Sequence, residues 1–525
     1  MASVADLDRT LYQVHQTSPV VQLICKTAFD NLTDSEKRYA ALVASACWRG
    51  ALICTLQTSP ESPYIFAMFR HAFDGACFKT SNWAPFNHDG VSSDAYEQAM
   101  AYIGAFFANL GNYKSFGDTK IIPECSPKEL LQVLLGAAKL SQSEERVLAL
   151  WQRVEKAMYS LEPRLRALGF GPTDGLSTYF SSNCTKEDAA ICQKFLDSNS
   201  ISAYNTRLFK TIDPDSKAVT YTIRVAASDK SVDEPVEFEG FHFVIMRGDY
   251  SPIMQRTAGL LRAAAEAGAN ETQTKMNNLY ADCFESGDLN KHIDGSREWI
   301  KDKGPAVESY IGFIESYQDP AGSRGEWEGF VAVVNREMSR KFQQLVDSAE
   351  SLLPLLPWPT NFEKDQFQRP DFTSLEVLAF GSSGIPAGIN IPNYNSVRQT
   401  DGFKNVSLGN VLASAYKPKG ADEPVTFLHK SDVKLYSELV TEAFEVQVGL
   451  HELLGHGSGK MFMGEGSADG IVNPLTGAPV ASYYKAGETY DSVFGSMGGS
   501  SFEECRAELV GMHSSPNPSA LAVFG

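Results

Sequence analysis

The sequence has no uninterrupted apolar run that would direct it to a membrane. Its first residues, MASVADLDRTLYQVHQ, are acidic early and contain no apolar core of the kind that a secretory signal needs. The most apolar later stretch, Ala40 to Leu56, is interrupted by Arg49 and follows a helical period, which predicts a buried helix and not a membrane span. We therefore expect a cytoplasmic protein with no membrane partner.

Positive charge is also in short supply. The chain has 46 Lys and Arg against 64 Asp and Glu, with a formal net charge of −18 and a pI near 5.0. A phosphate backbone is held by clustered basic side chains, so this balance argues against a nucleic-acid partner. The acidic excess suits cationic or amine-bearing ligands, and it is also common in soluble cytosolic proteins without such a ligand.

Cysteine pairs with a recognisable spacing are missing as well. The nine cysteines form an odd set without any CxxC pair: Cys25, Cys47, Cys54, Cys77, Cys125, Cys184, Cys192, Cys283 and Cys505. We expect them to be reduced thiols in a cytosolic protein. The sequence shows no internal repeat and no low-complexity tract, which excludes solenoid and fibrous folds. Its 525 residues, 43% of them hydrophobic, predict a globular protein of more than one domain.

Helical signals dominate the first third of the chain. From Thr33 the sequence opens with a Thr-x-x-Glu capping box and then keeps an apolar face at helical spacing. Apolar residues at helical spacing continue to about Leu168, which predicts a mainly helical N-terminal third. Helical composition returns between Ile253 and Gly268 and again from Glu328 to Leu353, where the prolines of LLPLLPWPT must end the helix.

Strand signals appear after Asn199. Residues Ala218 to Val225 alternate apolar and polar side chains, and Val236 to Met246 is rich in aromatic and β-branched residues. We expect both to be strands, the second kinked at Gly240. Phe380 to Lys419 is rich in Gly, Pro and Asn but also holds Ile, Tyr and Val, which predicts an ordered loop packed against a domain face.

The most informative segment, TEAFEVQVGLHELLGHGSG, places two histidines around a glutamate on an apolar helix. Zinc peptidases with H-E-x-x-H have their histidines at i and i+4, on one helix face. Here His451 and His456 are five residues apart, which an ideal helix would separate by about 140°. The extra residue must be absorbed by a π-type bulge, and Gly455 is where this distortion causes least crowding. We therefore predict a bulged zinc-binding helix.

A third protein ligand is expected downstream, because catalytic zinc keeps three protein ligands and an open position for water. The helical segment FEECRAELV offers Glu503, Glu504 and Glu508, and spacing alone does not choose among them. One should bind the metal, and another should orient a ligating histidine. Glu452 is then the general base that takes a proton from the water. A structural zinc site is the alternative, but it would normally include cysteine, and only Cys505 lies near.

HELLGH followed by EECRAE is the pairing that marks the dipeptidyl peptidase III family of zinc exopeptidases, which this chain resembles. Further segments are similar to that family across nearly the whole sequence: GNYKSFGDTK (Gly111 to Lys120), SAYNTRLFK (Ser202 to Lys210), RGDYSP (Arg247 to Pro252), KGPAVESYIGFIESYQDP (Lys303 to Pro320), GIPAGINIPNY (Gly384 to Tyr394) and GFKNVSLGNVL (Gly402 to Leu412). The resemblance implies a peptidase that releases N-terminal dipeptides from short peptides and holds one Zn²⁺ per chain.

The resemblance also assigns roles to single residues. It makes Glu504 the third zinc ligand beside His451 and His456, and it makes Glu508 the partner of a zinc-bound histidine. It implies that Tyr317 hydrogen-bonds the developing oxyanion and that Glu315 pairs with the free amino terminus of the substrate. Asn390 and Asn393 match the asparagines that hold the same end of the substrate. Without the resemblance, we would interpret Tyr317 as a packing aromatic and Glu315 as a surface acid. The two asparagines would be interpreted as turn residues.

The fold implied by the resemblance is α+β, with two lobes around a wide cleft. A mixed lower lobe with a small β-barrel would comprise residues 1–338 and 371–417, the latter with the Asn-rich substrate loop. A mainly helical upper lobe carrying the zinc site would comprise residues 339–370 and 418–525. We expect the protein to be a monomer.

Two departures from the family pattern stand out. Chains of the family continue past the EECRAE helix, whereas this one stops at Gly525, so we expect a C-terminally shortened member. A catalytically impaired binding or regulatory form is therefore the alternative function, and recruitment to another reaction on small aromatic compounds is a third. Animal members carry an ETGE segment that binds a Kelch-type repressor of the oxidative-stress response. The loop here reads Asn473-Pro-Leu-Thr-Gly-Ala478, so no such binding is expected.

Overall fold

A computed structural model describes the chain over residues 8–15, 21–73, 90–170, 175–367, 369–415, 425–464, 470–485, 488, 493 and 496–524. Cys77 and the expected lobe boundary at Lys417 lie outside the described residues. The eight cysteines that are described form no disulfide, as expected from their spacing.

The capping box at Thr33 forms as the sequence predicts. The Thr33 hydroxyl accepts the backbone N–H of Glu36, and the Glu36 carboxylate accepts the backbone N–H of Thr33 at 2.7 Å. Helices α2 (Asp34–Gly50) and α3 (Leu52–Thr58) follow. Within the described residues this stretch has the length and hydropathy of a membrane span, yet 56% of its most apolar window is buried inside the protein. The prediction of a buried helix is therefore confirmed.

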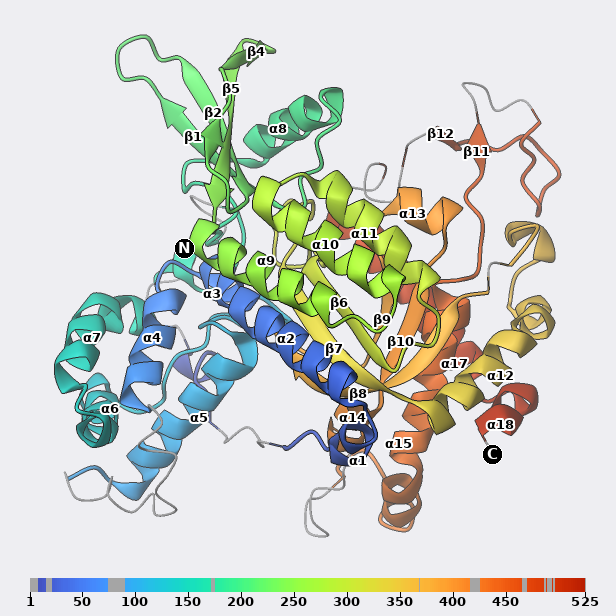
Figure 1. Cartoon of the computed structure of the whole chain (residues 1–525), viewed down its shortest axis with the longest axis horizontal. Coiled ribbons are helices and arrows are strands. Elements are labelled where there is room, and N and C mark those ends of the chain that lie inside the picture. The colour runs from blue at the N-terminus through green and yellow to red at the C-terminus, as the bar shows by residue number, and fades with distance from the viewer. Residues whose placement is uncertain are drawn as a thin grey trace.

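Helices make up most of the described N-terminal third. Four of them form a bundle around a core that includes Phe69, Tyr102 and Trp151: α4 (Ser62–Ala72), α5 (Ser93–Asn109), α6 (Pro127–Ser141) and α7 (Glu144–Tyr159). Short helical turns precede and follow the bundle: η2 (Arg9–Leu11), α1 (Lys26–Asp30) and η4 (Pro163–Leu165). Figure 1 shows this bundle at one side of the molecule, apart from the large central sheet.

A small sheet follows, covered on one face by α8 (Lys186–Ser198). Its strands are β1 (Thr206–Ile212), β2 (Val219–Ala226), β3 (Ser231–Val232), β4 (Val236–Phe238) and β5 (Phe241–Asp249). The first predicted strand is confirmed as β2. The second is wrong as a single kinked strand, because Glu239 and Gly240 both have positive φ and turn the chain back on itself. This is the backbone of a tight hairpin, in which β4 pairs with β5.

The central sheet has five strands in the order β6-β7-β8-β10-β9 and curls into a half-barrel. They are β6 (Val307–Phe313), β7 (Trp327–Asn335), β8 (Asp371–Phe380), β9 (Gly388–Ile391) and β10 (Lys404–Leu408). Figure 1 shows α2, α9 (Ser251–Glu266), α10 (Glu271–Ser286) and α11 (Leu289–Lys301) covering one face. The predicted helix from Ile253 is thus confirmed as α9.

Two expectations about this sheet were wrong. Glu328 to Asn335 is strand and not helix, because β7 is buried on both faces and its apolar run GFVAVV shows no alternation. The helix expected there begins only at Arg336, as α12 (Arg336–Leu352), and gives way at Leu353 to the short turn η5 (Leu353–Leu355). The Phe380 to Lys419 segment is not only loop, because it supplies β9, β10, α13 (Asn395–Thr400) and α14 (Gly409–Ala415).

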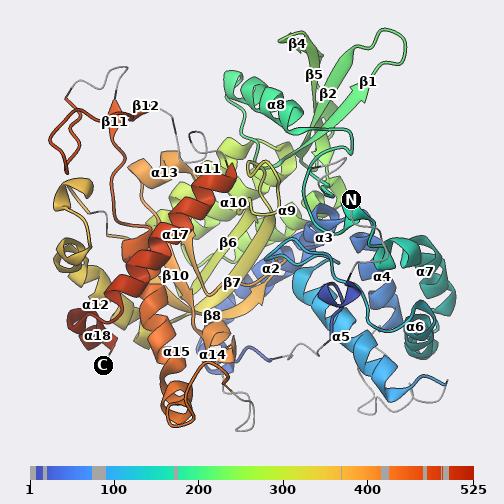
Figure 2. The same cartoon turned by 180° about the vertical axis from the view of Figure 1, so that it is seen from behind.

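The second lobe is mainly helical. It packs α12, α15 (Val433–Leu450), α17 (Ser496–Ser514) and α18 (Pro518–Phe524) around a core that includes Phe342, Leu450 and Val510. Short elements complete it: η6 (Thr360–Phe362), β11 (Met463–Gly464) and β12 (Tyr484–Lys485). Figure 2 shows α15 and α17 in front of the central sheet, on the face away from α9 to α11. The two-lobed α+β fold is as expected, whereas the residue limits assigned to each lobe remain predictions.

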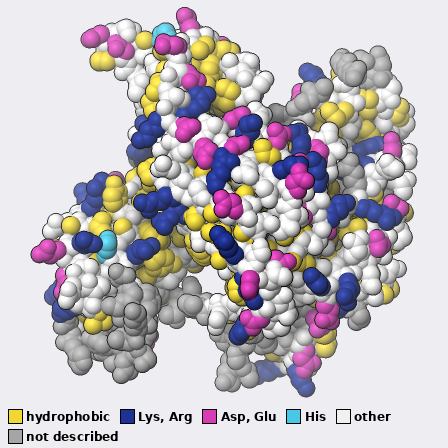
Figure 3. All heavy atoms as spheres, in the orientation of Figure 1, with side chains coloured by type: hydrophobic (Ala, Val, Ile, Leu, Met, Phe, Trp, Pro, Cys, Tyr) yellow, Lys and Arg dark blue, Asp and Glu magenta, His cyan; other side chains and the backbone are white. Residues whose placement is uncertain are grey.

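The outer face of α9 to α11 carries charges of both signs. Figure 3 shows basic and acidic side chains interspersed on this side of the molecule. Several of them are paired: Arg262 with Asp282 and Glu285, and Arg297 with Asp294. This face therefore offers no extended basic surface for a phosphate backbone.

A close contact between α2 and β7 gives a test of the core. A Cβ added at Gly50 would lie 1.9 Å from Cζ2 of Trp327, whose side chain is fully buried. Gly50→Ala should lower the free energy of unfolding by about 3 kcal/mol through overpacking. The matched control is Gly104→Ala in α5, where a Cβ meets nothing within 4 Å. That change should raise stability by roughly 0.5–1 kcal/mol. Urea denaturation of both variants checks this, and equal effects would contradict it.

Candidate active site

The two histidines of the motif lie on a π-helical turn. Helix α15 ends at Leu450, and His451–Gly455 continues as the π-turn η7. The backbone N–H of His456 donates to the carbonyl of His451 at 3.0 Å, a bond that spans five residues. This pattern brings residues five apart onto one side of the helix, and the two imidazole centroids are 4.9 Å apart. The predicted bulge is confirmed.

Gly455 has a further reason to be glycine that the sequence did not reveal. A Cβ there would lie 2.7 Å from the Cα and 2.8 Å from the carbonyl oxygen of Ala507. The backbone of α17 therefore passes directly against the π-turn. This approach brings Glu503, Glu504 and Glu508 to the histidines.

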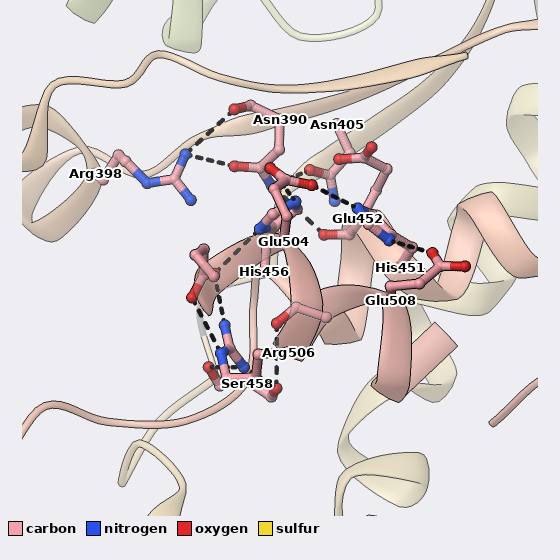
Figure 4. Close-up of polar contacts among 12 residues, drawn as sticks. Asn390, Arg398, Asn405, His451, Glu452, His456, Ser458, Glu504, Arg506 and Glu508 are labelled. Carbon is pink, nitrogen blue, oxygen red and sulfur yellow. Dashed lines mark hydrogen bonds and ion pairs between the residues drawn. The ribbon is translucent and has the colours of Figure 1, made fainter. Parts of the chain in front are cut away.

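One side of each imidazole faces the same carboxylate. The Nε2 atom of His451 is 3.6 Å from Oε2 of Glu504, and the Nε2 atom of His456 is 3.9 Å from Oε1. The three potential ligand atoms all lie within 4.8 Å of one another. Two ligands of a tetrahedral zinc ion at ~2.1 Å lie about 3.4 Å apart, so this donor set fits zinc with small adjustments. Figure 4 shows the three side chains converging.

The other side of each imidazole is held by a second carboxylate. The Nδ1 atom of His451 is 3.1 Å from Glu508 Oε2, and the Nδ1 atom of His456 is 3.1 Å from Glu503 Oε1. An ionised carboxylate only accepts hydrogen bonds, so each Nδ1–H donates to the carboxylate behind it, which would leave each Nε2 to bind a metal ion held beside Glu504. Gln447 donates to Glu508 and fixes it in turn.

The position of Glu503 was open in the sequence, and its place beside His456 was missed. Arg506 donates to both of its carboxylate oxygens, at 2.6 and 3.0 Å. Burial raises the pKa of Glu503, but the hydrogen bonds from His456 and Arg506 outweigh it and lower the pKa to about 2. The i, i+3 spacing of Glu503 and Arg506 was the available signal.

Glu452 points from the same turn into a cavity between the lobes. Its side chain is 6% exposed, and Oε2 has no hydrogen-bond partner in the described part of the chain. Gly388 of β9 makes room for it, since a Cβ there would lie 3.1 Å from Oε1. Burial raises the pKa of this carboxyl, and the neighbouring histidines oppose that shift. An unpartnered buried carboxylate beside two metal-binding histidines is suited to accept a proton.

The cavity has a volume of about 800 Å³ and brings the predicted site residues together. Its lining includes both histidines with Glu452, Glu504 and Glu508 on one side, and Glu315, Tyr317, Asn390 and Asn393 on the other. The four residues of the second group come from the ends of β6 and β9. All nine residues named from the sequence thus border one space.

Glu315 and Asn393 contact each other on the sheet side of the cavity. The Asn393 amide donates to Oε2 of Glu315 and to the carbonyl of Ile314, both at 3.1 Å. Burial raises the pKa of Glu315 to about 7. Tyr317 is 47% exposed, and the nearby Glu315 charge raises the pKa of its hydroxyl. It can therefore donate a hydrogen bond across the whole neutral range.

Asn390 sits among partners that the sequence did not single out. Its amide donates to Asn405 of β10, and its side-chain oxygen accepts from Arg398 of α13. Figure 4 shows Arg398 reaching Asn390 from the side opposite the histidines. Arg398 lies eight residues after Asn390 in the sequence, and only the fold of the intervening segment brings the two together.

Two further carboxylates line the cavity and were also missed. Burial raises the pKa of Glu326 to about 8 and that of Glu328 well above its usual value. Oε1 of Glu328 has no hydrogen-bond partner among the described residues. The i, i+2 spacing of two acids beside a strand was the signal for a shared face. The sheet side of the cavity is therefore acidic and favours cationic groups.

Comparison with known proteins identifies a family and several relatives that are longer than this chain. Residues 150–525 match the family described as Peptidase family M49. Dipeptidyl peptidase 3 of Homo sapiens is 49% identical over an alignment covering 98% of this chain and 71% of the human protein. Dipeptidyl peptidase 3 of Nematostella vectensis is 46% identical, with 99% and 73% covered.

Solved structures agree on the fold. The structure of DPP III from Caldithrix abyssi superposes with a TM-score of 0.60 at 15% identity, covering 97% of this chain and 76% of that one. DPP III from Corallococcus sp. strain EGB gives 0.58 at 17% identity, with 96% and 75% covered. With the family match and the identity of nearly half its residues to the human relative, the chain belongs to peptidase family M49.

Proposed function

We propose that this chain is a zinc-dependent dipeptidyl peptidase that releases dipeptides from the amino terminus of short peptides. One observation carries the proposal: a His-His-Glu donor set and a buried, unpartnered Glu452 share a cavity with a carboxylate that can bind an ammonium group. Membership of a peptidase family and relatives named dipeptidyl peptidase 3 support it.

The metal centre of this proposal holds one zinc ion. His451 and His456 bind it through Nε2, and Glu504 through its carboxylate, while Glu508 and Glu503 keep the imidazoles in the right tautomer. When bound, zinc supplies Lewis-acid polarisation of the scissile carbonyl and acidifies a water molecule. The chain itself supplies the orientation of the ligands and the groups that move protons.

Two residues carry the proton chemistry in this proposal. Glu452 accepts the proton of the attacking water at its unpartnered Oε2. Tyr317 keeps its proton because its pKa is raised, and its hydroxyl donates to the oxygen that gains negative charge. They act from opposite walls of the cavity, Glu452 from the helical lobe and Tyr317 from the chain after β6.

Selection of the amino terminus falls to the sheet side. Glu315 pairs with the substrate ammonium, and Asn393 and Asn390 hold the same end of the peptide. A carboxylate set back from the metal fixes how many residues lie between the free amine and the scissile bond. This arrangement accounts for an enzyme that counts residues from the amino terminus.

The remaining expectations about partners stay predictions. The Asn473–Ala478 loop is a hairpin closed by one hydrogen bond from the backbone N–H of Asn473 to the carbonyl of Ala478 at 2.8 Å, with Leu475 largely exposed at its tip. It carries no glutamate, so we expect no binding to a Kelch-type repressor. The monomeric state and the cytoplasmic location are likewise expectations from the sequence.

Replacing Glu452 tests the proton acceptor. Glu452→Gln should lower kcat by about 10²- to 10⁴-fold, because the amide cannot take a proton from water. Zinc content should remain at one ion per chain. The control is Glu442→Gln on the exposed face of α15, which should leave both quantities unchanged. Steady-state kinetics and metal analysis by mass spectrometry measure the two quantities. If Glu452→Gln retains full hydrolysis, Glu452 is not the proton acceptor.

Replacing Glu503 tests whether it supports His456. Glu503→Ala should weaken zinc affinity by about 10- to 100-fold, because the imidazole loses the partner that fixes its tautomer. Glu508→Ala should act similarly through His451. Cys505→Ser, between them on α17 and exposed, is the control. Competition with a chromogenic chelator measures the affinities, and an unchanged affinity in Glu503→Ala would show that the contact has no such role.

Replacing Glu315 tests recognition of the amine. Glu315→Gln should lower kcat/KM for an unblocked tetrapeptide by about 10- to 100-fold, the value of a hydrogen bond between charged groups. A des-amino analogue of the same peptide should be affected less than twofold. Equal losses on both peptides would contradict the role.

The raised pKa of Glu315 also predicts a pH dependence. Above about pH 7 the free carboxyl is ionised and attracts the ammonium, and below it the carboxyl is neutral. For the unblocked peptide, kcat/KM should therefore fall as the pH drops through about 7. In Glu315→Gln, the fall of kcat/KM with decreasing pH should be smaller, because the amide does not ionise.

A further inference from the structure

The two outer strands of the central sheet meet at a seam. The strand order makes β6 and β9 the two edges, and no ladder joins them in the described part of the chain. The sheet nevertheless curls until side chains bridge the two edges, as Asn393 does when it donates to the carbonyl of Ile314. Glu315 follows β6 and Asn393 follows β9, so the amine-binding residues lie at this seam.

A buried histidine joins the same two segments. His292 of α11 is 1% exposed, and its Nε2 atom lies 2.8 Å from the carbonyl oxygen of Ile311 in β6. Its Nδ1 atom lies 2.9 Å from the hydroxyl of Tyr394, the residue after Asn393. Because a carbonyl only accepts, Nε2–H donates to Ile311 and Nδ1 accepts the proton of Tyr394.

The charge state of this imidazole fits that arrangement. Burial lowers the pKa of His292 to about 4, so the ring is neutral in the physiological range. A neutral imidazole has one donor and one acceptor, which are the two roles that Ile311 and Tyr394 require. Both bonds are therefore satisfied at once.

The surroundings leave the ring no other position. A Cβ added at Gly312 would lie 2.3 Å from Nε2, so β6 has a glycine where the imidazole approaches it. The ring of Tyr280 stacks on the other side, with centroids 4.5 Å apart and planes 24° apart. His292 is thus fixed by shape as well as by hydrogen bonds.

The contacts of Tyr394 extend this constraint to Asn390. The backbone carbonyl of Tyr394, which precedes α13, accepts the backbone N–H of Arg398 at 2.9 Å. The Arg398 guanidinium in turn donates to the side chain and the backbone carbonyl of Asn390. Both asparagines that face the substrate amine are therefore tied to the segment that His292 holds.

We propose that His292 is a positioning residue for amine recognition, which sets the spacing of Glu315 and Asn393 by joining the Ile311 carbonyl to the Tyr394 hydroxyl across the seam. His292 is not among the residues that line the cavity, so it acts through Ile311 and Tyr394. The inference rests on the proposed function, because Glu315 and Asn393 are taken there as the residues that bind the amino terminus.

The test removes the link without disturbing the cavity. Tyr394→Phe deletes one oxygen, and His292→Phe keeps a flat ring but removes both hydrogen bonds. The matched control is Tyr280→Phe, since Tyr280 contacts the same imidazole through its ring and not through its hydroxyl. Kinetics are measured with an unblocked tetrapeptide and its des-amino analogue, together with zinc content and melting temperature.

A positioning role predicts a selective effect. Tyr394→Phe and His292→Phe should raise KM for the unblocked peptide by about 5- to 20-fold, the value of one buried hydrogen bond or somewhat more. The turnover number, the zinc content and the kinetics on the des-amino analogue should change less than twofold. Tyr280→Phe should match the parent chain, and the double variant at 292 and 394 should be no worse than His292→Phe alone.

Several outcomes would overturn the proposal. Equal losses on both peptides would show a general structural role, and an unchanged KM in Tyr394→Phe would show that the link is not used. If His292→Phe does not fold, Tyr394→Phe alone decides. If the parent chain hydrolyses neither peptide, the proposed function fails, and amide hydrogen exchange tests the seam separately. Exchange in residues 311–317 and 388–394 should then be faster in Tyr394→Phe than in the parent chain, and equal rates would refute the link.

Discussion

The backbone contact between Gly455 and Ala507 is the constraint on which the rest of the site depends. It lets α17 lie against the π-turn with no side chain between them. Three glutamates on one helix then reach two histidines on another, one between the rings and one behind each. The single close approach therefore brings every proposed ligand into place, and the carboxylate behind each histidine then orients its imidazole.

The acidic side chains on the two walls of the cavity differ in how well their charge is compensated. On the helical side, the histidines and Arg506 compensate most of the acids, so Glu503 stays ionised. On the sheet side, Glu326 and Glu328 are buried and Glu315 is partly buried. These three carboxyl groups form no ion pair among the described residues, and their pKa values are raised. Burying carboxyl groups in this way costs stability in the absence of a ligand. An entering ammonium group offsets that cost, which favours amines over neutral ends of a peptide.

Short-range patterns predicted much of this molecule, and long-range packing explains what they missed. The Thr33 capping box and the π-turn depend on spacings of three and five residues, so both could be predicted. Strand β7 could not, because burial on both faces removes the alternation that marks a strand. The contact of Glu503 with His456 could not be predicted, because it depends on which face of α17 packs against η7. The residue spacing within each segment gives no information on that packing. The spacing of the motif predicted His451, His456 and Glu452, whereas the resemblance supplied the roles of Glu504, Glu508, Tyr317, Glu315, Asn390 and Asn393, and the structure places all of them around one cavity.

The parallel pairing of β10 with β8 has a consequence for how this protein can change over evolutionary time. Two parallel neighbours need a connection that returns the chain to the same end of the sheet, and here that connection, the crossover, consists of β9, which pairs antiparallel with β10, and α13. It carries Asn390, Asn393 and Arg398. A substitution in the crossover therefore disturbs sheet connectivity along with peptide choice. The exposed rim of the cavity around Phe116 and Ile385 lies outside the strands of the sheet, so a substitution there leaves the sheet connectivity unchanged. New substrate preferences should accumulate at that rim, while the crossover stays nearly fixed.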